Sequence, residues 1–457
     1  MSLQLPPPVD ATPARAGMAD RLAAMIRVPT ISAEADARGS AFEDFIALLA
    51  GLYPQLHEHL SLERIGQFGL VYTWSSVAPN DADPVVLMAH YDVVPVAGQE
   101  TEWSVPPFEG RIADGYVWGR GALDDKGALC TLFEAVENLV SEGWGPPRTV
   151  LLCLGPDEEV MGATGRLIAN TLRERGVRPW LVLDEGGAIS EVPFPGVDGT
   201  FAMVGLAEKG VLTVELKASG EGGHASAPSG LTAVGRIARA VAKLNHNPFD
   251  VHMPRTVVDL FTRLADFAEP KYARIWALAA RSPWLTARAL LAGGGADGAA
   301  LVRTSLAPTM LSGGSSPNVL PSSASAMLNI RVNVGETIAG VVVRLRRVIN
   351  DSSVEVRVVE GEESSPESPS DNAQFALISR AVAAGYPGVP TLGYLTMAAT
   401  DGRHWHRFVP SVYRFAPLHM SAQQRASIHG IDERVSVDSL LRGERVYRAL
   451  LTHLLEA

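Results

Sequence analysis

The stretch Val86-Leu-Met-Ala-His-Tyr-Asp-Val-Val-Pro95 decides the fold class of this chain. It is an apolar run that ends in one histidine, His90, and one aspartate, Asp92. Helix-like segments and further apolar runs alternate after it, in the order GALCTLFEAVENLV, RTVLLCLG, TGRLIANTLRERG and PWLVLDEGG. Continuous Val- and Leu-rich strands that alternate with amphipathic helices indicate a sheet covered on both faces, and therefore an α/β domain.

The composition narrows the class of protein. The chain has 457 residues, 47% of them hydrophobic, which is enough for more than one domain. Its net charge of -11 argues against a nucleic-acid binder. It contains no run of about 18 apolar residues and no secretory signal, so we expect no membrane partner. Cys130 and Cys153 lie outside any CxxC pair. We interpret them as free core thiols and expect a cytoplasmic protein.

The pattern changes near residue 208. GVLTVELKASG (210–220) and ASAMLNIRVNV (324–334) alternate apolar and polar positions, as half-buried strands do. We therefore predict that an α+β domain, residues 208–362, interrupts an α/β domain formed by residues 1–207 and 363–457. The Ser-, Pro- and Glu-rich stretch from Gly361 to Asp371 is typical of a linker.

Four acidic or histidine-bearing motifs fall at the C-terminal ends of the apolar runs. They are His90 with Asp92, Asp124 with Asp125 (GRGALDDKG), Glu158 with Glu159 (GPDEEVMG), and Asp184 with Glu185 (LVLDEGG). One such pair is commonly a helix cap or a solvated turn. Four pairs in the crevice at the carboxyl ends of the strands would repel one another unless a cation were bound. Mixed histidine and carboxylate ligands suit Zn²⁺, with Mn²⁺ or Co²⁺ as alternatives.

These motifs, in this order, resemble the di-zinc exopeptidase and deacylase family of carboxypeptidase G2, succinyl-diaminopimelate desuccinylase and carnosinase. The likeness continues through GGHASAPS, NVLP, NIRVNVGET and SIHGIDERV, and spans roughly residues 84–435. TDGR and WSVPPFEGRIADGYVWGRGALDDKG bring the chain nearest to the carboxypeptidase S branch, which includes hydrolases of N-fatty-acyl amino acids. That branch usually has serine where Gly402 stands. The resemblance implies a mixed-sheet zinc-exopeptidase catalytic domain interrupted by an α+β lid or dimerisation domain, and a homodimer.

The resemblance also implies two Zn²⁺ ions per subunit, with Co²⁺ or Mn²⁺ as alternatives. The ligands that it assigns are, in chain order, His90, Asp124, Glu159, Asp184 and His429. Asp124 bridges the metals, His90 and Asp184 complete the shell of the first, and the other two ligands hold the second. Asp92 accepts the other ring N–H of His90, a usual role for a carboxylate behind a histidine ligand. The peptide bond between Asp124 and Asp125 is expected to be cis.

The remaining roles follow from the same resemblance. Glu158 is the general base that takes a proton from the water between the metals and delivers it to the leaving amine. His224 stabilises the oxyanion, arriving from the other subunit in dimeric relatives; the alternative is a turn residue among glycines. Arg331 pairs with the free carboxylate of the substrate, unless it is an ordinary strand arginine. Asn318 and Arg403 are further candidates for the substrate site. Three histidines match no ligand of the family and are interpreted as structural or surface residues: His404, His406 and His419.

The site implied by the resemblance hydrolyses an amide next to a free carboxylate, in an N-acyl amino acid or at the C-terminal residue of a small peptide. Residues 254–306, rich in Leu, Ala and Trp, line an acyl pocket in one interpretation and form amphipathic packing or a subunit contact in the other. A dipeptidase or aminoacylase of the same family is one alternative. A catalytically silent member with a binding role is another, although every expected ligand is present. A closed structural zinc site would use cysteines, which the motifs lack.

Overall fold

The computed structural model describes residues 13–455, except for residues 35–38 and 78–80 and the single positions 97, 193, 227, 229 and 247. The chain forms two compact units, and each is described by itself. Unit 1 comprises Met1–Leu206, Ser368–Tyr394 and Thr400–Ala457. Unit 2 comprises Ala207–Glu367 and Leu395–Ala399.

A mixed sheet forms the centre of unit 1. Its spatial order is β1 (Ser61–Ile65), β2 (Gly69–Trp74), β6 (Val150–Gly155), β3 (Val85–His90), β7 (Leu181–Asp184), β17 (Val412–Arg414), β9 (Thr200–Glu208) and β16 (Thr391–Thr396), and β8 (Ala188–Glu191) pairs with β9. β3 is parallel to both β6 and β7, and β17 is parallel to β7. The carboxyl ends of these strands therefore lie along one edge of the sheet.

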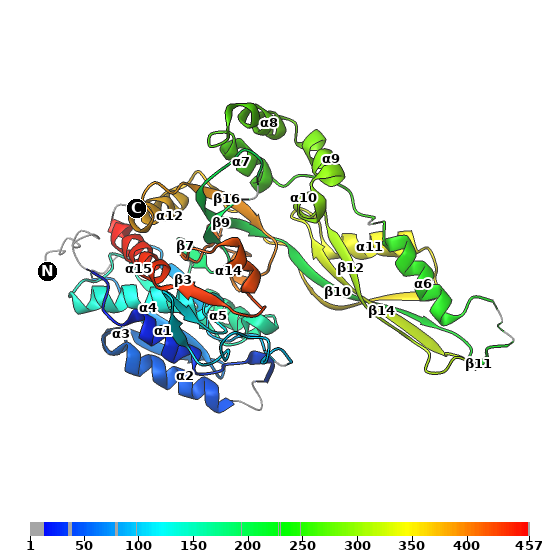
Figure 1. Ribbon diagram of the computed structural model, residues 1–457, viewed down its shortest axis with the longest axis horizontal. Coiled ribbons are helices and arrows are strands. Elements are labelled where there is room, and N and C mark those ends of the chain that lie inside the picture. The colour runs from blue at the N-terminus through cyan, green and yellow to red at the C-terminus, as the bar shows by residue number, and fades with distance from the viewer. Residues whose placement is uncertain are drawn as a thin grey trace. The chain divides into compact units, whose positions relative to one another are not determined.

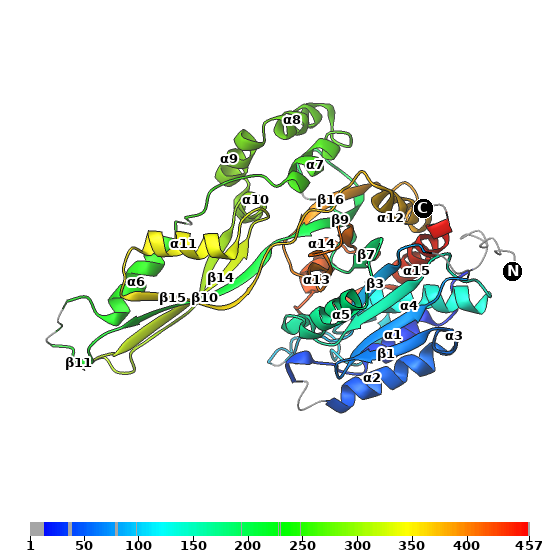
Figure 2. The same cartoon turned by 180° about the vertical axis from the view of Figure 1, so that it is seen from behind.

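Helices cover both faces of this sheet, because successive side chains of a buried strand point to opposite faces. Leu87 of β3 belongs to one apolar core and Met88 to the other. The first core is covered by α1 (Met18–Ile26), α2 (Gly39–Leu52), α3 (Pro54–His59), α4 (Lys126–Ser141), α12 (Ala373–Gly385) and α15 (Val437–Thr452) (Figure 1). The second is covered by α5 (Ala163–Glu174) and α13 (Gly402–Trp405) (Figure 2). The predicted α/β class is confirmed.

A small antiparallel sheet joins two segments of unit 1 that are far apart in sequence. It consists of β4 (Arg111–Ala113), β5 (Tyr116–Trp118) and β18 (Arg434–Ser436). Arg434 of β18 lies opposite Trp118 of β5. Just before β18 comes the short helix α14 (Ala422–Ser427), which begins with a capping box formed by Ser421 and Gln424. This pairing brings the segment that follows α14 beside the loop that precedes α4.

Unit 2 has its own antiparallel sheet, in the order β12 (Ser305–Gly313), β14 (Ser323–Val332), β10 (Gly210–Ser219) and β15 (Val354–Glu362). Burial alternates along β14, as the sequence predicts for a half-buried strand. The buried face packs against α6 (Ala233–Leu244) and α11 (Ile338–Ile349). A separate two-stranded ladder joins β11 (Gly223–His224) to β13 (Val319–Leu320).

Four consecutive helices occupy most of the Leu-, Ala- and Trp-rich segment of unit 2. They are α7 (Arg255–Leu264), α8 (Pro270–Arg281), α9 (Pro283–Gly293) and α10 (Gly295–Val302). Phe261 of α7 stacks on Trp276 of α8, with ring centroids 5.3 Å apart. The helices α7 and α8 therefore pack on each other through aromatic side chains.

Three smaller expectations can be compared with the structure. Cys130 and Cys153 are free and buried, as predicted. In the described part of the chain, every helix is too short or too polar to cross a lipid bilayer.

The predicted linker has no helix or strand after Glu362, but hydrogen bonds hold it in place. The N–H of Ser368 donates to the carbonyl of Leu206 at 2.8 Å, and its hydroxyl accepts the N–H of Val412 at 3.0 Å.

Candidate metal centre

Three predicted ligands follow the carboxyl ends of three neighbouring parallel strands. His90 is the last residue of β3, and Asp184 is the last residue of β7. Glu159 lies in the 3-10 turn Glu158–Val160, just beyond β6. Because β3 lies between β6 and β7, the sheet brings these side chains to one edge.

The other two predicted ligands, Asp124 and His429, lie in loops. Nε2 of His90 is 3.0 Å from Oδ1 of Asp124, and Nε2 of His429 is 3.2 Å from Oδ2 of the same carboxylate. Nε2 of His429 is also 3.0 Å from Oε2 of Glu159. The peptide bond between Asp124 and Asp125 is cis, as the resemblance implies. Asp124 thus presents one oxygen to each histidine, as a carboxylate shared by two metal ions would.

Asp92 orients both His90 and the turn that carries the two glutamates. Its Oδ1 accepts from Nδ1 of His90 at 3.2 Å, so that Nε2 faces Asp124. The backbone N–H groups of Glu158 and Glu159 donate to the two oxygens of Asp92, at 3.2 and 3.1 Å. Asp92 is fully buried, and one side chain therefore fixes two parts of the site.

The donor set and its electrostatics fit a cation. Donor atoms of His90, Asp124 and Glu159 lie within 4.8 Å of one another. Hydrogen bonds to Asp124 and Glu159 raise the pKa of His429 to about 10. Burial alone would raise the pKa of Asp124, but its hydrogen bonds to His429 and His90 outweigh burial and hold that pKa below its ordinary value. The carboxylates of Asp124 and Glu159 thus favour a positive charge beside them, which a protonated histidine can supply. A metal ion bound by nitrogen and oxygen ligands would supply it too.

Glu158 lies at the same edge with a different environment. Burial raises the pKa of its carboxyl well above the ordinary value, and the negative charges of Asp401, Asp92 and Glu159 add to this, opposed by His90. A carboxylate that holds a proton more tightly than usual is suited to proton transfer near neutral pH.

Asp184 and Arg403 are held by backbone groups of unit 1. Oδ2 of Asp184 accepts the N–H of Gly402 at 2.6 Å, and Oδ1 accepts the N–H of Glu185 at 3.0 Å. Arg403 is buried, and its Nη2 donates to the carbonyl of Met161 at 3.2 Å. Asp184 lies close enough for its charge and that of His90 to influence each other.

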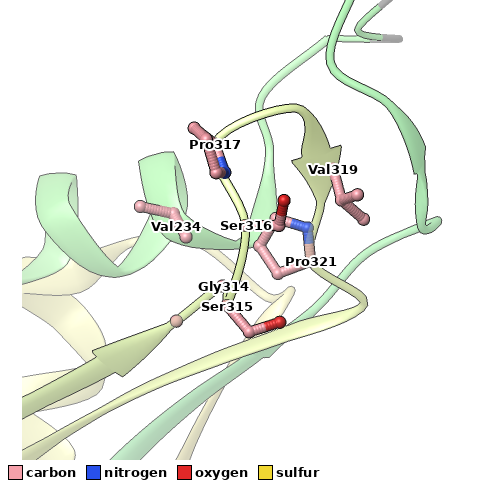
Figure 3. A pocket seen from close by; sticks show the side chains of 8 residues that line it. Val234, Gly314, Ser315, Ser316, Pro317, Val319 and Pro321 are labelled. Carbon is pink, nitrogen blue, oxygen red and sulfur yellow. The ribbon is translucent and has the colours of Figure 1, made fainter.

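The other three predicted residues belong to unit 2. His224 in β11 pairs with Val319 in β13, and Asn318 precedes that strand. Oδ1 of Asn318 accepts the hydroxyl of Ser316 at 2.6 Å. Arg331 lies in β14, opposite Val211 and Ser305. Beside β13 the structure has an open pocket of about 340 Å³ (Figure 3), lined by Val234, Gly313, Gly314, Ser315, Ser316, Pro317, Val319 and Pro321.

Glu433 is a buried residue at this centre that the sequence did not single out. Its carboxylate accepts the N–H groups of Gly121, Leu123 and Asp124 at 3.1, 2.8 and 3.1 Å. Nη1 of Arg120 donates to it at 2.7 Å, and Nη2 donates to the carbonyl of Gly430 at 2.9 Å. Its position four residues after His429, within the SIHGIDERV motif, was the available signal. Glu433 and Arg120 thus tie the Asp124 loop to the His429 loop.

Comparison with known proteins places this chain in a family. Residues 86–453 match the model of peptidase family M20/M25/M40. Probable carboxypeptidase S-like 2 of Dictyostelium discoideum is 33% identical over 92% of this chain and 82% of its own length. The N-fatty-acyl-amino acid synthase/hydrolase PM20D1.1 of Danio rerio is 32% identical over 93% of this chain and 83% of its own length.

A solved structure shows the same fold. The M20 family metallo-carboxypeptidase Sso-CP2 from Sulfolobus solfataricus superimposes with a TM-score of 0.71 at 16% identity, covering 97% of this chain and 100% of its own. The resemblance drawn from the motifs is thereby confirmed. The chain belongs to peptidase family M20/M25/M40 and is a metal-dependent hydrolase.

Proposed function

We propose that this protein cleaves the amide bond of N-acyl amino acids, or releases the C-terminal residue of small peptides, with two zinc ions per subunit. The observation that carries the proposal is Asp124, whose two oxygens face His90 and His429 separately. The names of relatives, carboxypeptidase S-like and N-fatty-acyl-amino acid hydrolase, support an amide next to a carboxylate. Two free cysteines favour a reducing compartment such as the cytoplasm.

We assign the first zinc to His90 and Asp184 and the second to Glu159 and His429, with Asp124 shared between them. Two such ions would polarise the substrate carbonyl and lower the pKa of a water molecule. Cobalt or manganese would suit the same nitrogen and oxygen donors. Asp92 would not bind metal itself. Its carboxylate accepts from Nδ1 of His90 and holds the imidazole in the tautomer that leaves Nε2 for the metal.

Glu158 is the proposed general base. It would take a proton from the attacking water and deliver that proton to the leaving amine. Its raised pKa supports both halves of this transfer, since the group can hold the proton between the two steps. Positioned bases of this kind contribute roughly 10²–10⁴-fold to the rate.

Four further residues are proposed to act on the substrate. His224 would donate to the oxyanion, and in a homodimer it would come from the partner. Arg331 would bind the substrate carboxylate, for which a guanidinium is well shaped. Arg403 would help to bind the same carboxylate, and Asn318 would line the substrate site. His224→Ala should lower kcat while leaving zinc content unchanged, and Arg331→Ala should mainly raise KM, in steady-state assays of purified protein.

The decisive assay measures release of free amino acid from a panel of N-acyl amino acids of increasing chain length and of dipeptides. Metal-depleted protein would be tested before and after addition of two equivalents of Zn²⁺, with Glu158→Gln as the variant. Zinc should restore cleavage by the wild type, and Glu158→Gln should bind zinc but lose at least about 100-fold in rate. Glu444→Gln, which alters a buried glutamate on α15, is the matched control and should remain active.

The same assay separates the alternatives. A preference for dipeptides would make the protein a dipeptidase of the family. A peak at short acyl groups would reject fatty-acyl substrates. Stoichiometric zinc binding without cleavage of any substrate on the panel would favour the catalytically silent reading.

A further inference from the structure

Helices α8 and α9 of unit 2 follow one another along the chain (Figures 1 and 2). Both helices expose large apolar side chains. The exposed fractions are 54% for Ile275, 64% for Leu278, 62% for Trp284 and 60% for Leu285. Apolar groups clustered on a surface mark a site of interaction rather than a core. The opposite side of α8 is anchored, because Trp276 is buried and stacks on Phe261 of α7.

Exposed Lys and Arg side chains lie on α8 and α9 near these apolar side chains. Lys271, Arg274 and Arg281 are exposed on α8, at helical spacing from Ile275 and Leu278. On α9, the guanidinium of Arg288 lies 4.5 Å from the ring of Trp284. We call the set the α8–α9 surface, composed of Lys271, Arg274, Ile275, Leu278, Arg281, Trp284, Leu285 and Arg288.

The charge of this surface is opposite to that of the protein. Residues 269–297 contain four Lys or Arg and two acidic residues, Glu269 and Asp297, whereas the whole chain has a net charge of -11. Oε2 of Glu269 lies 4.0 Å from Nζ of Lys271, so the positive charge of this surface rests mainly on Arg274, Arg281 and Arg288. A local excess of positive charge attracts the anionic headgroups of a bilayer, by about 1 kcal/mol for each Lys or Arg near the surface, and exposed aliphatic and indole groups beside those cations can enter the headgroup boundary. The indole ring and the arginine stems suit a boundary that is apolar below and charged above.

We propose that the α8–α9 surface binds the surface of an anionic lipid bilayer. Lipid phosphate groups would pair with Arg274, Arg281 and Arg288. The side chains of Ile275, Leu278, Trp284 and Leu285 would enter the boundary of the acyl chains. A second copy of this chain fits less well, because a symmetric contact would oppose the cations of one copy to those of the other. This departs from our expectation, based on the lack of an apolar span, that no membrane takes part.

Cosedimentation of the full-length protein with lipid vesicles tests the proposal. Vesicles of phosphatidylcholine containing phosphatidylserine should bind the wild type, and vesicles of phosphatidylcholine alone should bind it much more weakly. Arg274→Gln and Arg281→Gln should each weaken binding about five-fold at low salt. Leu285→Ser should weaken it at least about ten-fold, and Leu441→Ser, which alters an exposed leucine of unit 1, should leave it unchanged.

Circular dichroism and thermal melting of each variant establish that it is folded. Equal affinity for charged and neutral vesicles, or full retention of binding by Leu285→Ser, would overturn the proposal. So would failure of the folded wild type to sediment with anionic vesicles at low salt. A sedimentation velocity experiment adds one more contrary outcome, in which Leu285→Ser dissociates an oligomer and the wild type ignores lipid. That result would make the surface a subunit contact.

Discussion

Glu433 shows what a single buried carboxylate can do for a metal site without being a ligand. It accepts three backbone N–H groups from the loop that carries Asp124 and receives Arg120 as a counter-charge. It also stands in the same loop as His429. Removal of its charge should therefore loosen the spacing between two ligands rather than remove either.

We expect Glu433→Gln to weaken zinc binding about 10- to 100-fold, the usual cost of losing a residue that orients ligands. The measurement is competition with a zinc chelator, which does not depend on activity. Glu444→Gln is the matched control, because Glu444 is equally buried and also pairs with an arginine, Arg448, but not near the ligands. If both variants lost zinc equally, the effect would be one of general stability.

His406 gives a prediction about pH. Its ring nitrogens lie 3.1 Å from the hydroxyl of Ser368 and 3.2 Å from Nη1 of Arg414. Burial, and then the charge of Arg414, lower its pKa to about 2. The unfolded chain binds a proton here below about pH 6.5, whereas the folded protein does not. This contribution to stability is therefore full above pH 6.5 and is lost as the pH falls toward 2.

Below pH 6.5 the free energy of unfolding should fall less steeply with falling pH in His406→Gln than in the wild type. The difference in slope should be up to about 1.4 kcal/mol per pH unit. Urea unfolding of both proteins between about pH 4 and pH 6 measures this difference in slope. A constant offset with parallel slopes would mean that His406 titrates alike in the folded and unfolded chains.

At the scale of elements, helix α4 sets the position of the Asp124 loop. It is buried along almost its whole length and begins directly after Asp125. A Cβ atom at Gly127 would overlap the carbonyl oxygen of Ala122, which belongs to the loop itself. The helix and the loop can therefore approach so closely only because residue 127 has no side chain.

Gly127→Ala should destabilise the protein by about 1–3 kcal/mol, the usual cost of overpacking. Gly51→Ala is the control, because a Cβ at this exposed position of α2 meets nothing within 4 Å. It should stabilise the protein by up to about 1 kcal/mol. Chemical denaturation of the two variants measures both effects, and equal signs would contradict the packing argument.

The sequence predicts the elements whose pattern is local. Val85–His90 reads as a buried strand from its own residues, and the ligand pairs follow from where such strands end. β17 could not be predicted in this way. Its three residues, Val412–Arg414, are too few to show an alternation of apolar and polar positions. Its partners β7 and β9 lie about two hundred residues earlier. Sequence analysis missed Glu433 for a related reason, because the pairing of β18 with β5 brings this residue to the Asp124 loop.

At the scale of the molecule, all five proposed metal ligands belong to unit 1, whereas unit 2 has a separate apolar core. Calorimetry should therefore resolve two unfolding transitions. Ligand binding stabilises only the state that binds it. Chelation of the metal should lower the midpoint of the unit 1 transition and leave the other in place, and added zinc should reverse the shift. A chelator that moves both transitions together would show that the units unfold as one.

The position of β17 in the sheet has a consequence for synthesis. The ribosome completes β7 and β9 early, but the place between them stays empty until residues 412–414 have been translated. All strands of the unit 2 sheet lie within residues 210–362, so that sheet is complete before β17 is translated. At the usual elongation rates, the nascent chain keeps an open sheet edge for about 10–40 s. A translational pause upstream of residue 412 would prolong the exposure of that edge to chaperones and to neighbouring nascent chains.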